Sequence, residues 1–302
     1  MPLTVAISTT RRVWWWTRRA TFRRELPESW KDVPATRRRR WLSWWLDYPA
    51  DAQKRITRDA LRLPGWAWRA MGDAERQALQ DQFRWTQPTA QCTEVPIEQV
   101  RHKGRTYCFP TAKGQNMTAI EYAAAEDYYK AVDEGDERSL LLLAATLWRE
   151  RDADHAAALR RGDVRVPLFD KAEAEDRAER LKDAPPEMLI QALLYFVGLK
   201  VYMHRVYRTW LFESNDDDDD EQEEDDSPAT PNARPPSDGP DFGLWGAFQW
   251  VAEVGVFGVV KEVYQTPIHE VFVFMVRKRI EAERMKSAYS TPQGPKDFDD
   301  HV

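Results

Sequence analysis

The sequence predicts a mainly α-helical protein: a helical domain with a minor β-hairpin component, a disordered acidic linker and a C-terminal helical pair. Three features predict this class: apolar residues at helical spacing, an acidic and proline-rich run after residue 212, and two short extended segments around Gly104. With 302 residues, 42% of them hydrophobic, the chain can bury a core. We expect a domain at 1–212, a linker at 213–241, an apolar module at 242–286 and a disordered tail at 287–302.

The formal net charge of -6 conceals an uneven distribution of charge. Residues 1–70 contain 16 Lys and Arg against 6 Asp and Glu, whereas residues 213–242 contain 1 against 13. In the second stretch like charges repel and prolines donate no backbone hydrogen bonds, so little offsets the entropy of ordering the chain. A basic N-terminal head and a disordered acidic linker are therefore predicted on one chain.

The first hundred residues contain several candidate elements. Leu3–Ile7 and Thr21–Leu26 could form the strands of a small basic hairpin. Arg37–Leu46 and Ala52–Leu63 mix apolar and basic residues in a manner typical of short helices. A third helix is predicted at Asp73–Phe83, with Asp73 as its N-cap and acidic residues in its first turn.

The centre of the first domain shows two local signals. Val95–Val100 and Arg105–Phe109 flank a His-Lys-Gly sequence in which Gly104 can supply the positive φ of a tight turn, which predicts a β-hairpin. Thr118 and Glu121 form a T-x-x-E capping box, in which each side chain bonds the backbone of the other residue. A helix is expected from this box to about residue 132.

Three further helices are predicted at Ser139–Trp148, Lys171–Leu181 and Glu187–Phe212. The longest of them carries apolar residues at steps of three and four, which predicts one buried stripe. The stripe comprises Leu189, Leu193, Phe196, Leu199, Met203, Val206 and Trp210. After the linker, helices are expected at Gly243–Val254 and Ile268–Met285, joined through Gly255, Gly258 and Pro267.

Searches for catalytic motifs give no positive signal. Neither G-x-x-x-x-G-K nor G-x-G-x-x-G occurs among the 13 glycines, so nucleotide hydrolysis is not expected. His269-Glu270 opens like a zincin helix, but Val273 stands where the second ligand would be. A carboxylate pair that meets only in space would leave no such motif. An enzyme with a spatially assembled carboxylate site therefore stays as a third hypothesis.

Two groups of residues contain side chains that could ligate a metal, and each has a simpler structural explanation. Cys92, His102 and Cys108 bracket the predicted hairpin, but they lack the C-x-x-C pair of strong zinc sites, so buried thiols are favoured. Asp152 and Asp154 offer oxygen ligands before His155, yet the rest of a calcium loop is missing, so helix-terminal solvation is favoured. We expect no metal and no cofactor. Two cysteines and the lack of an apolar stretch of roughly 18–20 residues favour a cytoplasmic protein without a membrane span.

The basic head mixes arginines with tryptophans. Arginine neutralises phosphate and tryptophan stacks on bases, so Arg37, Arg38, Arg39 and Arg40 are candidates for anion or nucleic-acid contact. Three alternatives stay open for this head: nucleic acid, the acidic residues of this chain or of a partner protein, and a solvated face over a tryptophan core. Nucleic acid is not the favoured one.

The apolar C-terminal module is the favoured partner-binding surface. Its two predicted helices carry too much apolar surface to stand alone in water, so they bind a partner or dock back on the first domain. The candidate contact residues are Trp245, Phe248, Val251, Phe257, Ile268, Phe272 and Met275.

A set of segments spread over most of the chain carries a resemblance to a known group of proteins. They are Leu26–Trp30, Gly104–Tyr107, Met117-Thr118, Asp136–Arg149, Leu193–Phe196 with Gly198, and Ala252-Glu253 with Gly255, Phe257 and Gly258. Together they resemble phage and prophage proteins of Bacteroidetes-type genomes that are encoded in the tail-morphogenesis region, similar to tail-assembly chaperones.

The resemblance implies a helical, non-enzymatic protein that acts before or during tail assembly. In tail-assembly chaperones a helical domain keeps the apolar tape-measure protein in solution and recruits tail-tube subunits. The implied partners are the tape-measure or tail-tube proteins, or a second copy of this chain, in the host cytoplasm or the virion. The alternative is a nucleic-acid-associated packaging or connector protein, or a virion structural protein, that uses the Arg/Trp-rich N-terminus.

Overall fold

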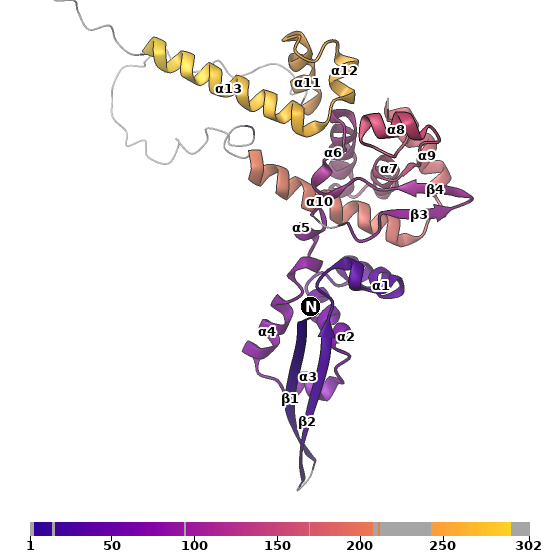
Figure 1. Ribbon diagram of the computed structural model, residues 1–302, viewed down its shortest axis with the longest axis vertical. Helices are drawn as coiled ribbons and strands as arrows, with labels where there is room; N and C mark the ends of the chain where they lie inside the picture. Colours follow the sequence, from indigo (N-terminus) through magenta and orange to yellow (C-terminus); the bar gives the residue numbers. More distant parts are fainter. Residues whose placement is uncertain are drawn as a thin grey trace, which may run out of the picture. The chain divides into compact units, whose positions relative to one another are not determined.

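The computed structural model describes residues 3–13, 16–93, 95–168, 170–207, 211 and 243–290. The chain divides into two compact units, Met1–Tyr202 and Met203–Val302. The described residues are mainly helical with two small antiparallel sheets, so the predicted fold class is confirmed (Figure 1). The predicted acidic linker at 213–241 and residues 291–302 of the predicted tail lie outside the described residues.

The first unit begins with an antiparallel β-hairpin, β1 (Leu3–Val13) and β2 (Trp16–Leu26). The strands pair from Leu3 opposite Leu26 to Val13 opposite Trp16, so the hairpin is longer than the sequence suggested. Ile7 and Leu26 are buried near its base, where β1 contacts α3 and β2 contacts α2. Trp14 and Trp15 lie outside the described residues.

Short helices follow the hairpin. They are η1 (Trp30–Asp32), α1 (Ala35–Asp47), α2 (Ala52–Leu61), α3 (Gly65–Ala70), α4 (Asp73–Asp81), η2 (Arg84–Thr86) and α5 (Pro88–Gln91). The N-cap prediction for α4 is wrong by one residue: Gly72 is the N-cap, and its amide donates to Glu75 Oε2 at 3.0 Å. Asp73 instead takes the first helical position, where a negative charge also favours the helix dipole.

An aromatic cluster forms the core of this region. The rings of Trp30, Trp41, Phe83 and Trp85 lie 5.4–6.4 Å apart, and Trp30, Trp41 and Phe83 are fully buried. Tilted and edge-on aromatic pairs at such distances add to the stabilisation from burial. Trp30 and Trp41 of the basic head therefore belong to the core.

The second sheet is small and antiparallel. It consists of β3 (Gln99–His102), β4 (Arg105–Cys108) and β5 (Arg149–Glu150). Lys103 and Gly104 have φ of 46° and 78°, the left-handed pair that a two-residue hairpin turn requires, so the predicted hairpin is confirmed. β5 was not predicted, because two residues leave no periodicity.

The rest of the first unit is helical. Its elements are η3 (Ala112–Gly114), α6 (Ala119–Asp133), α7 (Glu137–Leu147), α8 (His155–Arg161), α9 (Lys171–Leu181) and the main part of α10 (Pro186–Tyr207). The capping box is confirmed, since the Thr118 amide donates to Glu121 Oε2 at 2.9 Å. Asp154 accepts from the amide of Ala157 at the start of α8, in line with the expected helix-terminal role.

Helix α10 is buried on more than one side, which corrects the predicted single stripe. Ile190 and Leu194 join the core of the hairpin region, while Tyr195 and Phe196 pack with Phe109 and Tyr122. Val206, a predicted member of the stripe, is 47% exposed, and Trp210 lies outside the described residues. A helix shared between two packed regions shows no single apolar face.

Gly198 allows the closest backbone approach on α10. A Cβ atom built there would lie 2.4 Å from the carbonyl oxygen of Pro88 and 3.3 Å from the amide nitrogen of Cys92. Both atoms belong to the backbone around α5, which cannot move aside as a side chain can. Glycine is required at this position by packing.

The described part of the second unit contains the end of α10, α11 (Gly243–Glu253), α12 (Val260–Gln265) and α13 (Ile268–Ser290). Helix α12 lies in the stretch predicted to be only a connection, and α13 runs past the predicted end at Met285. Tyr207 Oη and His269 Nδ1 are 2.8 Å apart, and the Tyr207 ring packs edge-on against Phe272. No helix among the described residues is long and apolar enough to cross a membrane.

Replacement of Gly198 tests the close approach. Gly198→Ala should destabilise the chain by about 1–3 kcal/mol, because overpacking against the backbone outweighs the better helix propensity of alanine. Val201→Ala, at an exposed position of the same helix, should change stability by less than about 0.5 kcal/mol. Urea denaturation of the three chains measures both effects. A stabilised Gly198→Ala chain would contradict the packing described.

Candidate functional site

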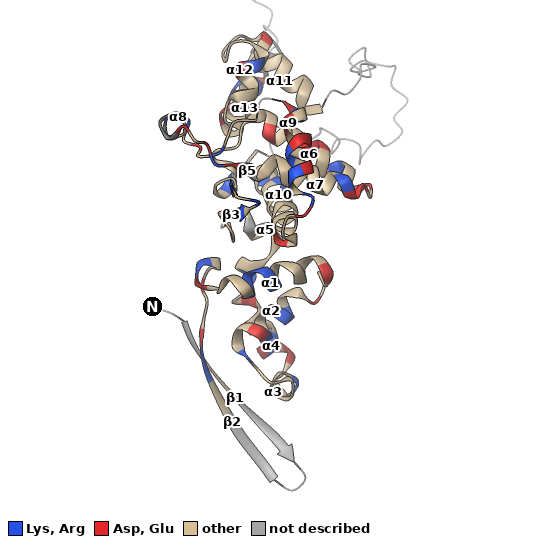
Figure 2. Ribbon diagram, turned by 90° about the vertical axis from the view of Figure 1, so that its right-hand side faces the viewer, with Lys and Arg blue, Asp and Glu red and all other residues tan. Residues whose placement is uncertain are grey.

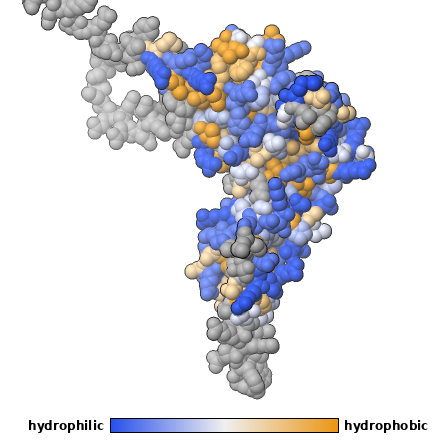
Figure 3. Space-filling view, in the orientation of Figure 1, coloured by the Kyte–Doolittle hydropathy of each residue, from blue (hydrophilic) through white to orange (hydrophobic). Residues whose placement is uncertain are grey.

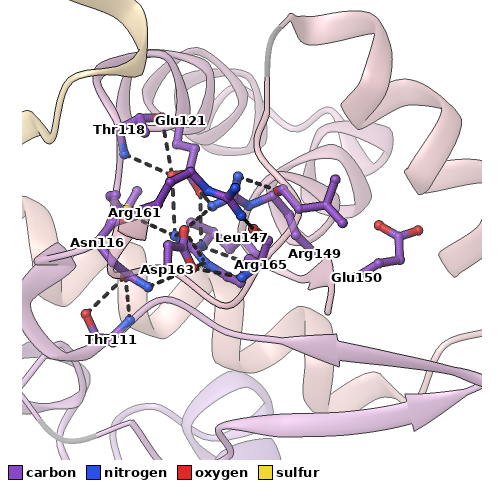
Figure 4. Close-up of polar contacts among 12 residues, drawn as sticks. Thr111, Asn116, Thr118, Glu121, Leu147, Arg149, Glu150, Arg161, Asp163 and Arg165 are labelled. Atoms are coloured by element: carbon purple, nitrogen blue, oxygen red, sulfur yellow. Dashed lines mark hydrogen bonds and ion pairs between the residues drawn. The ribbon is translucent and has the colours of Figure 1, made fainter. Parts of the chain in front are cut away.

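The largest cluster of buried charge lies in the first unit (Figure 4). Glu121 comes from the first turn of α6, Arg149 from β5, and Asp163 and Arg165 from the segment after α8. The side chains of Glu121, Arg149 and Arg165 are at most 1% exposed, and that of Asp163 is 11% exposed. We call these four residues the buried charge network.

Each arginine of the network contacts both carboxylates. Arg149 Nη2 lies 2.8 Å from Glu121 Oε1 and 2.9 Å from Asp163 Oδ2. Arg165 Nη1 lies 3.0 Å from Glu121 Oε1, and Arg165 Nη2 lies 2.9 Å from Asp163 Oδ2. Two positive and two negative charges therefore neutralise one another inside the fold.

Backbone carbonyls accept further hydrogen bonds from the two guanidinium groups. Arg149 Nη1 donates to the carbonyl of Val166 at 2.8 Å, and Arg165 Nη2 donates to the carbonyl of Asn116 at 2.9 Å. The Asn116 side chain donates to Asp163 Oδ1 at 3.1 Å and accepts from the backbone amide of Thr111 at 2.8 Å. The network thus joins the loop before α6 to the loop after α8.

A second charged layer lies beside the network. Arg177 of α9 is buried, and its Nε lies 2.8 Å from Glu150 Oε2, while its Nη1 donates to the carbonyl of Ala145 at 2.9 Å. Arg180, one turn later, lies 3.0 Å from Glu150 Oε1. Glu150 follows Arg149 in β5, so these pairs fasten α9 to the same strand. Figure 2 shows basic and acidic residues interspersed over the helices of this unit.

The electrostatics keep Arg149 and Asp163 charged at neutral pH. Burial, followed by the neighbouring Arg165, lowers the pKa of Arg149 to about 10, so the group still carries its proton. Burial opposes ionisation of Asp163, but the charge and hydrogen bonds of Arg165 outweigh it, so the pKa of Asp163 falls below its usual value. A general acid needs the opposite shift, because it must hold a proton near neutral pH. The arrangement suits a structural role.

Sequence reasoning found only one member of the network. Glu121 was predicted as a capping residue, and it does cap α6 while also pairing with both arginines. Arg149, Asp163 and Arg165 were missed. One signal was present for Arg149, because it directly follows the dense apolar helix ending at Trp148, where a charge must be paired or exposed.

The structure gives the four candidate arginines of α1 partners within the first unit. Arg37 and Arg40 form ion pairs with Asp59, at 3.6 Å for Arg37. Arg38 donates to the carbonyl of Pro96 at 2.7 Å, and Arg39 lies 2.8 Å from Glu187. Arg39 and Arg40 stay largely exposed, so anion contact there is untested, but each arginine already has a partner.

The three candidate zinc ligands lie in and beside the second sheet. Cys92 and Cys108 are buried, and His102 ends β3. Burial is the main cause that raises the pKa of Cys108, which disfavours the thiolate that zinc requires. In the part of the chain that the structure describes, no group of three or more His, Cys, Asp or Glu residues could hold a metal ion.

A cavity of about 450 Å³ opens at the base of the hairpin. Its lining combines Trp41 and Val33 with the carboxylates of Glu25, Glu28 and Asp32. Asp32 Oδ2 is engaged in capping η1, because it accepts from the backbone amides of Glu28 and Ser29 at 3.1 and 3.0 Å. This cavity brings three carboxylates together, so the hypothesis of a spatially assembled carboxylate site can be tested here.

The second unit separates the predicted partner-contact residues into two groups. Phe248, Val251, Ile268 and Phe272 are buried. Trp245, Phe257 and Met275 are half-buried. The four buried residues form the core of the second unit, and the three half-buried residues are the ones that a partner could contact.

Other apolar residues of the second unit are exposed. Trp250 is 42%, Val256 58% and Val259 65% exposed. The rings of Trp250 and Phe257 pack on Phe274 at 6.4 and 5.4 Å. We call Trp250, Val254, Val256, Phe257, Val259 and Phe274 the apolar surface. Figure 3 shows hydrophobic residues gathered over α11, α12 and α13.

Neutralising one carboxylate tests the buried charge network. Glu121→Gln should lower the free energy of unfolding by about 3–5 kcal/mol, because it leaves two buried arginines with one carboxylate. Glu134→Gln, at the exposed C-cap of the same helix, should change it by less than about 0.5 kcal/mol. Urea titration at pH 7 measures both variants. A loss below about 1 kcal/mol in Glu121→Gln would refute the importance of the network.

The lowered pKa of Asp163 predicts a pH dependence of stability. Because its folded pKa lies below the unfolded one, Asp163 stabilises the fold fully above about pH 4, and this contribution is lost as the pH falls further. Asp163→Asn should be less stable than the parent chain at pH 7, and the difference should narrow between pH 4 and pH 2. Urea midpoints over this range measure it. Parallel curves for the two chains would contradict the assignment.

The comparisons with known proteins add no relative to this picture. No family model, no curated protein and no solved structure matches the chain. The functional argument therefore rests on the residues and contacts described above.

Proposed function

We propose that this chain is a non-enzymatic assembly protein of the phage-tail chaperone type. Its apolar surface binds an apolar helical segment of a partner, such as a tape-measure or tail-tube protein, in the host cytoplasm during assembly. The observation that carries the proposal is the exposure of Trp250, Val256 and Val259 in the unit where Trp250 and Phe257 pack on Phe274.

Exposed apolar area is the driving force for binding. Burying apolar surface contributes roughly 25 cal/mol per Å², which amounts to about 1.5–3 kcal/mol for a fully buried valine or larger side chain. Val256 and Val259 are 58% and 65% exposed, so much of this free energy would be gained only when a partner buries them. Single exposed apolar residues are ordinary, but neighbouring ones indicate an interaction site.

The arrangement of the apolar surface favours a helical partner. Trp250 lies in the last turn of α11, and Val254 directly follows this helix with its amide donating to the carbonyl of Trp250 at 3.1 Å, so the two residues lie one turn apart. A partner helix with apolar residues at the same spacing can lay its side chains between them. α13 adds charged residues next to Phe274, among them Arg277 and Lys278, which can form a polar rim.

The buried charge network supports the non-enzymatic part of the proposal. Glu121 and Asp163 are both paired with arginines, and the pKa of Asp163 is lowered, so Asp163 does not suit the role of a proton donor. The first unit then serves as a rigid scaffold. The second unit binds the partner.

A double substitution tests the apolar surface. Val256→Ser with Val259→Ser should weaken binding to an apolar tape-measure helix by about 10- to 100-fold, since two valines lose their buried area. Val259 is the N-cap of α12, where serine is a preferred residue, so the helix should be retained. Affinity is measured by titrating the full chain into a labelled synthetic peptide from the tape-measure protein encoded in the same genome region.

The matched control places the same change on the first unit. Leu46→Ser with Val164→Ser removes two apolar residues that are 45% and 39% exposed there, and it should leave the affinity within about twofold. Equal affinity in all three chains, or no binding by the parent chain, would sink the proposal. Equal loss in both variants would show that apolar area in general, and not this surface, is responsible.

A further inference from the structure

The β1–β2 hairpin forms a two-stranded ribbon whose outer half has a different composition from its base. Each strand has 11 residues, or about 35 Å at the usual rise per residue. The base contains the buried Ile7 and Leu26, and Phe22 packs on Trp66 of α3 with ring centroids 6.0 Å apart. In Figure 1 the ribbon continues past α3.

The register concentrates arginine in the outer half. Arg11 lies directly opposite Arg18, and Arg12 and Arg19 occupy the adjoining positions, opposite Thr17 and Thr10. Because cross-strand partners share a face and neighbours along a strand alternate, Arg11 and Arg18 belong to one face, and Arg12 and Arg19 to the other. Each face of the ribbon thus carries two arginines within three register positions.

The register pairs residues of like charge, and a bound anion would relieve their repulsion. Like charges directly opposite each other destabilise an antiparallel pair. Leu3–Arg24 contains no Asp or Glu that could compensate. The hairpin together with α2 and α3 contains ten Lys and Arg against two acids, Glu25 and Asp59, and Asp59 already pairs with arginines of α1.

We propose that the outer half of the ribbon binds double-stranded DNA through its phosphates. The major groove is about 12 Å wide and admits a two-stranded ribbon, whose strands lie about 4.8 Å apart. A groove presents phosphates on two walls, which matches arginines on two opposite faces. An acidic peptide strand, such as residues 213–226 of this chain, lies against only one face. All six basic residues of the ribbon are arginine, whose planar group binds phosphate with two hydrogen bonds.

The first test is the salt dependence of binding to DNA. The full chain is titrated into a fluorescein-labelled 20-base-pair duplex, and anisotropy is followed at several salt concentrations. Neutralising four phosphates gives a slope of log K against log salt of about −3.6, or a loss of about 100-fold between 50 and 200 mM. No binding at 50 mM, or a slope near zero, would overturn the proposal.

The second test removes the four arginines. The quadruple glutamine variant of the ribbon should bind at least about tenfold more weakly at 50 mM salt and lose most of the slope. The matched control neutralises four exposed arginines of the same unit that lie outside the ribbon. These are Arg101, Arg138, Arg151 and Arg160. Circular dichroism and urea midpoints check that both variants keep the fold, and equal loss of DNA binding in both would overturn the assignment to the ribbon.

The third test separates DNA from an acidic peptide. A synthetic peptide of residues 213–226 is titrated in the same way, and DNA binding is repeated with a chain whose Asp216–Asp220 are replaced by Asn. Tighter binding of the peptide than of the duplex, lost in the ribbon variant, would assign the ribbon to acidic protein segments and overturn the DNA proposal. Duplex binding that persists or strengthens in the Asn chain supports it. Because the apolar surface lies in the other unit, failure here leaves the proposed function intact.

Discussion

The pairing of Arg149 and Arg165 with Glu121 and Asp163 is the constraint on which the first unit depends. Four charges inside the fold cost several kcal/mol each in lost hydration, and only mutual contact returns this free energy. The four residues come from α6, β5 and the segment after α8. Any alternative packing that displaces one of these segments leaves a buried charge without its partner, so the network selects one arrangement among those that would bury the same apolar residues.

The sequence predicts local features of this fold but not the contacts of the buried charge network. Helix starts, the hairpin turn at Lys103-Gly104 and the Thr118 capping box depend on residues within a few positions of one another, so local patterns indicate them. Arg165 meets Glu121 across 44 positions in the chain, and no spacing rule connects them. The same reasoning explains α10. Its apolar residues pack against two regions of the first unit, so they do not form the single buried stripe that the sequence predicted.

The arginines and tryptophans of the basic head look alike in sequence but differ in structure. The tryptophans at 30 and 41 are core because helical spacing turns them inward, while the arginines of α1 reach acids and carbonyls on neighbouring elements. A long side chain on a packed helix finds such partners readily. In the β1–β2 hairpin, by contrast, the register pairs Arg11 with Arg18, and this pairing is the basis for proposing a ligand there.

The connection between α11 and α12 carries the strongest argument about the second unit. It was predicted as a mere glycine link, and Gly255 and Gly258 do adopt positive φ, at 78° and 85°. A link needs only those glycines, yet it places Val256 and Val259 at 58% and 65% exposure beside Phe257. Polar residues at both positions would keep the turn and be better solvated. Exposed valines add nothing to the stability of the turn, which is the reason for proposing that a partner contacts this part of the second unit.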